Sequence, residues 1–138
     1  MLGALGLSDA ELCVMLTNDE LIHELNRKHR RKSKPTDVLA FPMDEHGRGP
    51  SGAVRMLGDV AISLDTAARQ ARARRHPLLR EVTELLAHGL LHLVGHDHRT
   101  DGEERAMNAA AASLVAVASA RSVLATQRAR SALTSRAR

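Results

Sequence analysis

Three short segments of the chain have the pattern of apolar and polar residues that is typical of β-strands. Residues 11–17, "ELCVMLT", alternate weakly, and residues 37–43 and 56–64 are apolar runs of strand length. Pro42 lacks a backbone N–H, so the second of these strands is predicted at an edge or an end of a sheet. One face of the first strand would carry Leu12, Val14 and Leu16.

Four other segments have the apolar spacing that is typical of α-helices, namely 19–29, 65–75, 78–94 and 103–125. The third of them, "LLREVTELLAHGLLHLV", is apolar on most sides, which predicts a central and buried helix. Capping residues and a glycine after a last turn indicate where these helices begin and end. The residues concerned are Asn18 or Asp19, Asp65, Pro77 and Gly95.

The order of these segments predicts an α/β (α+β) fold in which helices pack against a small sheet. A chain of 138 residues fits a single domain with a modest core, and we assign residues 1–125 to it. Residues 126–138 are rich in Arg, Ser, Thr and Ala and contain no acidic residue. This composition predicts a basic, disordered tail.

The composition narrows the classes of function. The net charge is +4 with histidine neutral and the pI is about 10.2, which favours polyanionic partners and above all nucleic acid. Phe41 is the only Phe, Trp or Tyr residue in the sequence, so stacking of bases on aromatic side chains is not expected. Cys13 is the only cysteine, which excludes a disulfide framework and a cysteine-based zinc site.

The location of the protein is predicted from what the chain does not carry. The first residues, "MLGALGLSDAEL", lack the basic and long apolar regions of a signal peptide. The alanine-rich run 106–120 is interrupted by polar residues, so we expect it to be too short and too polar to span a membrane. These features predict a cytoplasmic protein without a membrane partner.

Four of the eight histidines lie in "HGLLHLVGHDH", residues 88–98. Because residues four apart lie on the same helix face, His88 and His92 can point at one ion. Gly95 would let the chain turn, so that His98 can swing back as a third ligand. Three neutral imidazoles suit Zn²⁺ best and leave a fourth position for water, as in catalytic sites. The sequence therefore predicts one Zn²⁺ per chain.

Two alternatives stay open at this point. These histidines can be satisfied polar or surface residues, and His96 can replace His98 as the third ligand. Asp97 can orient an imidazole or simply form the turn. The residue after the first histidine is Gly89, whereas zinc proteases carry their general-base glutamate there. The metal-site spacing is therefore present without the main catalytic group of a protease.

The histidine segment is similar to the hallmark of the YbeY family of bacterial metal-dependent endoribonucleases, also called rRNA maturation factors. That hallmark is HGxLHLxGxDH, and every specified position matches. Residues 25–44, "LNRKHRRKSKPTDVLAFPMD", and 57–71, "LGDVAISLDTAARQA", resemble two further family segments in the family's order. The resemblance covers most of residues 11–107.

The resemblance implies an α/β fold with a central mixed sheet and a metal site at one end of a cleft. It implies that His88, His92 and His98 hold zinc and that Arg30 is a functional arginine. It also implies cleavage of single-stranded RNA in 16S rRNA 3′-end maturation and in 70S ribosome quality control. Family members usually carry a strand and a helix before the segment that matches "ELCVML", so we expect these two elements to be missing and the fold to be marginally stable.

A basic run precedes the second predicted strand and is our candidate RNA-binding segment. Six of the eight residues 27–34 are Lys or Arg, and a solvated loop is the alternative explanation. A guanidinium at Arg30 can grip a phosphate with paired donors and stabilise developing negative charge. The candidate RNA contacts are Arg27, Lys28, Arg30, Arg31, Lys32 and Lys34.

Three functions compete on the sequence. A zinc-dependent endoribonuclease, monomeric and acting on rRNA of the small ribosomal subunit, accounts for the histidines, the charge and the resemblance. A zinc metalloprotease-like hydrolase accounts for the histidines but not for Gly89. A non-catalytic ribosome-associated factor with structural zinc accounts for the charge but not for an open metal position. We predict the first, with Arg30, His88, His92 and His98 as its catalytic residues.

Overall fold

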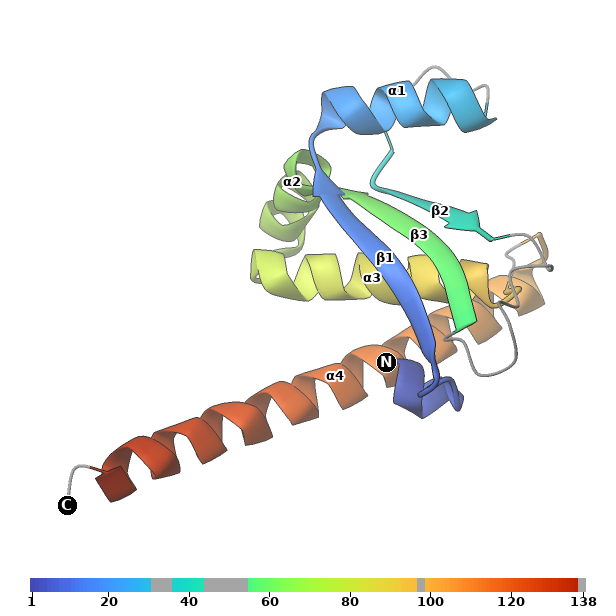
Figure 1. The fold of residues 1–138 in the computed structure, drawn as a ribbon. Helices are drawn as coiled ribbons and strands as arrows, with labels where there is room; N and C mark the ends of the chain where they lie inside the picture. Colours follow the sequence, from blue (N-terminus) through green and yellow to red (C-terminus); the bar gives the residue numbers. More distant parts are fainter. Residues whose placement is uncertain (31–35, 44–54, 97–98, 137–138) are drawn as a thin grey trace.

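The computed structural model describes residues 1–30, 36–43, 55–96 and 99–136. A short 3-10 turn, η1 (Leu2–Leu5), precedes a small sheet that is covered by helices on both faces (Figure 1). The predicted α/β class is confirmed.

Among the described residues, the sheet has three strands in the order β1–β3–β2. The strands are β1 (Ala10–Thr17), β2 (Val38–Pro42) and β3 (Arg55–Ser63). β1 runs parallel to the central β3, whereas β2 runs antiparallel to it, so the sheet is mixed. All three strands lie within one residue of the segments predicted from weak alternation or from short apolar runs. Pro42 is the last residue of an edge strand, as its missing N–H required.

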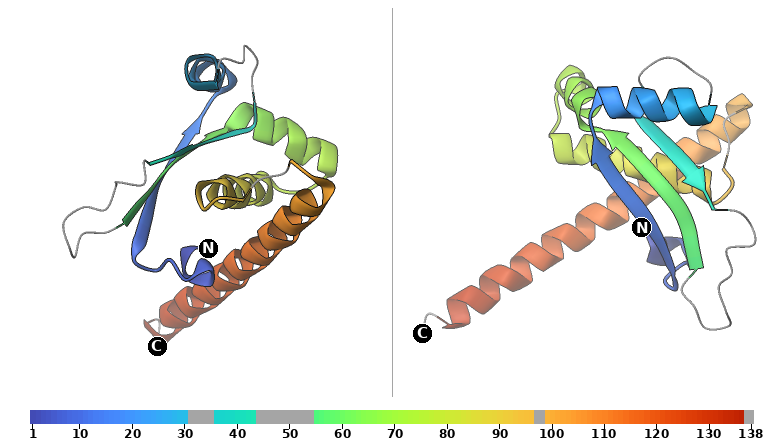
Figure 2. Two further views of the ribbon diagram at one scale, coloured as in Figure 1. Left: turned by 90° about the vertical axis from the view of Figure 1, so that its right-hand side faces the viewer. Right: turned by 45° about the horizontal axis from the view of Figure 1, so that its top comes forward.

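Four α-helices surround the sheet in the part of the chain that the structure describes. α1 (Asp19–Arg30) lies over one face, and α2 (Leu64–Arg74) and α3 (Leu78–Leu93) lie over the other. α4 (Asp101–Arg136) packs on the side of α3 that faces away from the sheet (Figure 2). α3 thus lies between the sheet and α4. It is central, as its apolar sequence predicted, but Leu78 and Leu79 at its start are exposed.

Side chains on both faces of β3 form the centre of the core. Val60 and Ile62 pack against α2 and α3. Ala61 points to the opposite face, where it meets Ile22 of α1 and Leu39 of β2. A third cluster joins α3, α4 and the start of the sheet, and it includes Leu57, Leu90, Leu91, Met107 and Leu114.

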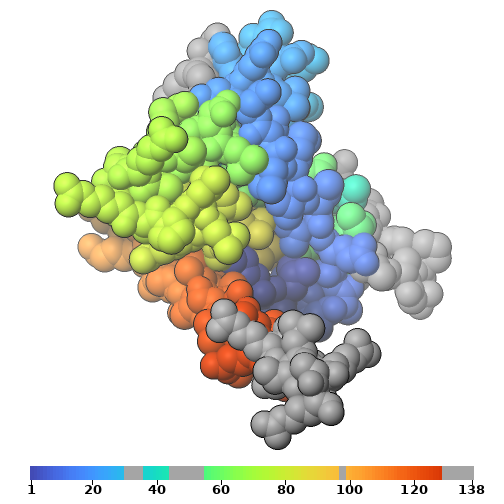
Figure 3. Space-filling view, turned by 90° about the vertical axis from the view of Figure 1, so that its left-hand side faces the viewer, coloured from blue at the N-terminus to red at the C-terminus, as the bar shows by residue number. Residues whose placement is uncertain are grey.

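β1 is less buried than its apolar sequence suggested. Leu12 packs against the core, but Val14 is 41% exposed and Leu16 is 53% exposed. The reason is that α3 lies over β2 and β3, so the outer strand extends past the helix layer. Figure 3 shows β1 at the surface beside α2. The face predicted for these three residues is therefore a core face only at its beginning.

α4 is longer than the helix expected from the sequence. It continues to Arg136, so residues 126–136 are helical where a disordered tail was predicted. The chain has neither Gly nor Pro after Gly102 and is rich in Ala and Arg, which favour a helix. By length and composition Asp101–Arg128 could cross a membrane, contrary to the expectation for this run. In its first half, Met107, Ala111 and Leu114 are buried against α3 in the core cluster described above, whereas most of the other residues there are exposed.

Candidate metal and RNA site

α3 carries two of the predicted metal ligands. His88 and His92 are four residues apart and lie in its last two turns, so they share one helix face. Both are half-buried, and the Nδ1 atom of His88 has no contact with solvent. The helix therefore places both histidines on one face, and their joint binding of a metal ion stays a prediction.

The chain turns sharply after α3. Gly95 has a φ of +98°, a conformation that favours glycine, and its N–H donates to the carbonyl oxygen of His92 at 3.1 Å. His96 follows and is exposed. His98, the third predicted ligand, and Asp97 lie outside the described residues. The predicted turn is confirmed, whereas the choice of third ligand stays a prediction.

Gly89 explains why no glutamate stands between the two histidines. It is buried where α3 meets the sheet, and a Cβ added there would lie 2.6 Å from Cγ1 of Val60 and 3.3 Å from Cγ2 of Val38. Any side chain at this position would be forced into the sheet. A glutamate here would need α3 and the sheet to move apart, so this packing leaves no room for the general base that zinc proteases carry at this position.

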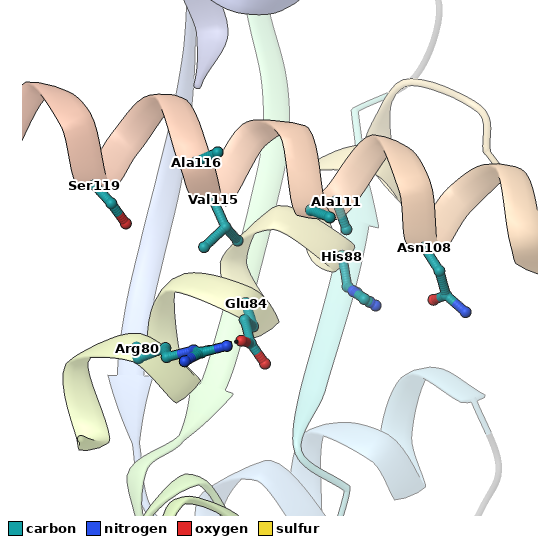
Figure 4. A pocket seen from close by; sticks show the side chains of 9 residues that line it. Arg80, Glu84, His88, Asn108, Ala111, Val115, Ala116 and Ser119 are labelled. Carbon is teal, nitrogen blue, oxygen red and sulfur yellow. Dashed lines mark hydrogen bonds and ion pairs between the residues drawn. The ribbon is translucent and has the colours of Figure 1, made fainter. Parts of the chain in front are cut away.

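His88 also lines a hollow of about 450 Å³ between α3 and α4. We name it the α3–α4 groove, and its walls include Arg80, Glu84, His88, Asn108, Ala112 and Ala116. His88 and Asn108 lie at one end of the groove and Arg80 at the other, with small side chains of α4 between them (Figure 4). The groove thus runs along α3 away from the histidine pair.

A buried carboxylate lies two turns before His88 and was missed by the sequence analysis. The side chain of Glu81 is 1% exposed, and its oxygens lie 3.0 Å from Nε2 of His76 and 3.4 Å from Nη1 of Arg74. Neither contact has the geometry of a hydrogen bond. Arg74 also pairs with Glu84 at 3.1 Å. Because these residues come from two helices and the turn between them, no sequence spacing signals the group.

His76, Glu81 and Glu84 have ligand atoms within 4.8 Å of one another, so they are a possible metal-binding group among the described residues. The guanidinium of Arg74, however, already balances both carboxylates. Displacing this cation would cost any metal ion part of its binding energy. We therefore assign this cluster to holding α2 against α3.

The basic run begins on α1 and continues beyond the described residues. Arg27 and Lys28 are exposed in its last turns, and Nζ of Lys28 pairs with the Glu24 carboxylate at 3.1 Å. Arg30 is the last residue of α1, and its side chain is not described. The remaining candidates for RNA binding lie outside the described residues: Arg31, Lys32 and Lys34.

The protein anchors the chain within the basic run and after it. On α1, the ring of His29 meets the ring of Phe41 edge-on, with centroids 5.1 Å apart, which joins the end of α1 to β2. After it, the Asp37 carboxylate accepts hydrogen bonds from the Val38 N–H at 2.8 Å and from Nε2 of Gln70 at 3.2 Å. Asp37 therefore forms the turn and links β2 to α2. The chain is thus held at His29, within the run, and at Asp37, after it.

Comparison with known proteins identifies the family. Residues 4–118 match the family model described as endoribonuclease YbeY. The chain belongs to the YbeY family. The resemblance seen in the histidine segment is confirmed, and the match ends within α4, so the last part of that helix lies beyond the matched region.

Curated endoribonuclease YbeY proteins are similar over most of this chain. The one from Aquifex aeolicus is 53% identical over 103 residues, which are 75% of this chain and 66% of the relative. The one from Anaeromyxobacter dehalogenans is 51% identical and covers 77% of this chain and 53% of the relative. The chain thus spans between about half and two thirds of these YbeY relatives.

A solved structure supports the fold. The solution structure of TM1509 from Thermotoga maritima superposes with a TM-score of 0.56 at 27% sequence identity. The superposition covers 81% of this chain and 70% of that protein. The small sheet with its helices is therefore an arrangement that an experimentally determined protein shares.

Proposed function

We propose that this YbeY-family chain is a metal-dependent endoribonuclease that cleaves single-stranded RNA. The observation that carries the proposal is the pair His88 and His92 on one face of α3, followed by the turn at Gly95, with His98 three residues later in the sequence. The names of the relatives, endoribonuclease YbeY, support RNA as the substrate. The net charge of +4 is consistent with a polyanionic substrate.

The donor set fits zinc. Two imidazoles four residues apart on α3 are ligands of the type and spacing that zinc sites use. Because Nδ1 of His88 is buried, we assign ligation to its Nε2. His98 would be the third ligand. Zinc, when bound there, would lower the pKa of water towards neutrality or polarise a phosphoryl oxygen.

The other residues of the site would bind and orient the RNA. Arg30 ends α1, and in Figure 1 this helix ends on the side of the molecule where α3 also ends. A guanidinium in this position would hold a phosphate by two parallel hydrogen bonds and stabilise charge that develops on it. Arg27 and Lys28 would add electrostatic attraction along the backbone of the strand.

We further propose that the substrate is ribosomal. In this account the chain trims the 3′ end of 16S rRNA and takes part in 70S ribosome quality control. It would act in the cytoplasm as a monomer bound to the small subunit. Depletion of the protein in its host should then lengthen the 3′ end of 16S rRNA, which primer-independent 3′-end sequencing measures. Unchanged 3′ ends would refute the ribosomal substrate but not the proposed cleavage of RNA.

An assay on two substrates tests the enzyme class. Purified protein should cleave single-stranded RNA, lose this activity with a chelator, regain it with zinc and leave casein intact. Digestion of casein would favour the protease-like hydrolase instead. Stoichiometric zinc without cleavage of either substrate would favour a non-catalytic ribosome-associated factor. The position of Gly89 against the sheet argues against the protease outcome.

A further inference from the structure

We propose that the α3–α4 groove is a subsite that binds one nucleotide of the RNA strand, next to the phosphodiester that reacts. This inference rests on the proposed function, because it takes the histidine pair as the place of cleavage. The groove begins at His88 and ends at Arg80, and both residues line it (Figure 4). The subsite would therefore be continuous with the reaction centre.

The dimensions of the groove suit a single nucleotide. Its volume of about 450 Å³ lies within the range of small-ligand sites, which is roughly 300–1,000 Å³. Arg80, Glu84 and His88 follow one another at intervals of four residues, so they form one stripe along α3. Eight residues of helix separate Arg80 from His88 by about 12 Å along the axis. A strand whose reacting phosphate lies at His88 would place its neighbouring nucleotide along this stripe.

Arg80 is positioned to receive the next phosphate. Its side chain is 63% exposed, and its Nε donates to Oε1 of Glu84 at 3.1 Å. Since a guanidinium has five N–H donors, the remaining donors are available to a phosphate. Glu84 is itself paired with Arg74 at 3.1 Å, so the carboxylate that holds Arg80 is fixed from a second side.

The wall formed by α4 suits the nucleoside. Ala112 and Ala116 present only methyl groups, and Val115 lies between them, so this wall is apolar and leaves room for the flat face of a base. Asn108 lies next to His88 and carries an amide that both donates and accepts hydrogen bonds, as the edges of bases require. A groove that is polar at both ends and apolar in its middle matches a nucleotide better than an acyl chain.

The test is to fill the groove with a larger side chain on its α4 wall. Ala112→Leu adds a side chain inside the groove, whereas Ala109→Leu adds the same side chain on the same helix outside it. Both positions are exposed, so neither change disturbs the core. Ala112→Leu should raise the KM for single-stranded RNA at least tenfold with little change in kcat, zinc content or Tm. Ala109→Leu should behave as the parent does.

Binding of adenosine 5′-monophosphate and adenosine, measured by calorimetry, separates this subsite from cleavage. Ala112→Leu should abolish binding of both probes. Arg80→Gln should lower the affinity for the monophosphate about tenfold and leave the affinity for adenosine unchanged, because only the phosphate contact is lost. If Ala112→Leu lowers the Tm, Ala116→Met, also exposed in the groove, replaces it as the test.

The outcomes distinguish this inference from the proposed nuclease. Equal KM values and equal nucleotide affinities for the parent and both leucine variants would overturn the subsite while leaving cleavage intact. Nucleotide binding that Ala112→Leu blocks, in a protein that cleaves no RNA, would support the subsite and refute the nuclease. Loss of the adenosine affinity in Ala109→Leu as well would also overturn it, because that residue lies outside the groove.

Discussion

Asp19 shows how one carboxylate can join two helices. It begins α1, and its side chain accepts hydrogen bonds from the hydroxyls of Ser63 and Thr66 at the start of α2 and pairs with Arg69 at 2.7 Å. A further hydrogen bond joins the two helices: the carboxylate of Asp65 on α2 accepts from the Asp19 N–H at 3.1 Å. The hydrogen bonds from Ser63 and Thr66, followed by Arg69, lower the pKa of Asp19 to about 2.

The lowered pKa of Asp19 predicts the pH dependence of this link. A carboxylate whose pKa is depressed in the folded state adds stability above its ordinary pKa of 3.8, and this contribution is lost as the pH falls towards about 2. Asp19→Asn should lower the free energy of unfolding at pH 7 by about 1 kcal/mol, since the partial exposure of the carboxylate limits the effect.

Urea denaturation at pH 7 and near pH 2 measures this effect, and the difference between parent and Asp19→Asn should shrink at the lower pH. Glu20→Gln removes an exposed carboxylate from the same helix turn and serves as the control. A difference between parent and variant that stays constant across this range would show that the charge of Asp19 does not hold the helices together.

At Arg30, the effect of the positive charge can be separated from the effect of the paired guanidinium donors. Arg30→Lys keeps the net charge but loses the planar pair of donors. We expect unchanged zinc content and Tm and a rate of RNA cleavage that falls on the order of 10²-fold under single-turnover conditions. Arg31→Ala should have a small effect, seen mainly as a shallower salt dependence of RNA binding. Cleavage by Arg30→Lys at the parent rate would identify Arg30 as one more solvated charge.

α3 packs closely against the sheet, and this contact fixes the position of the helix face that carries His88 and His92. Gly89 allows the helix to rest on Val60, and Gly→Ala within a helix normally stabilises by up to about 1 kcal/mol. Here the added methyl would overlap Val60, and overpacking of this kind costs about 1–3 kcal/mol. Gly89→Ala should therefore destabilise the protein, as measured by urea denaturation.

Two further variants make the Gly89 prediction specific. Gly102→Ala meets nothing nearer than Oγ1 of Thr100 at 3.9 Å, so it should be neutral or stabilising. Adding Val60→Ala to Gly89→Ala should recover part of the loss, which a double-mutant cycle reports as coupling. Independent effects of the two changes would contradict the close contact.

The sequence predicted where the strands and helices lie better than it predicted which of their residues are buried. The strand and helix positions followed from periodicity, and Pro42 and Gly95 marked boundaries that the structure confirms. The exposure of Val14 and Leu16 could not be predicted, because it depends on where α3 lies across the sheet. The helical state of 126–136 was missed because polar composition was weighed above helix propensity.

At the scale of the whole molecule, the candidate site was predictable only in part. A spacing of four residues revealed His88 and His92, since both lie on one helix. Glu81 and the α3–α4 groove were invisible in the sequence, because they arise where separate helices meet. The reason for Gly89 likewise needs the sheet to be in place.

Zinc stoichiometry of purified variants tests the proposed metal site itself. We propose that His88, His92 and His98 hold the ion and that the exposed His96 does not. Elemental analysis should therefore find about one zinc per chain in the parent and in His96→Ala, but close to none in His92→Ala, with the fold of each variant checked by circular dichroism. Undiminished zinc in His92→Ala would contradict the account, and loss of zinc in His96→Ala would show that the third ligand is wrong.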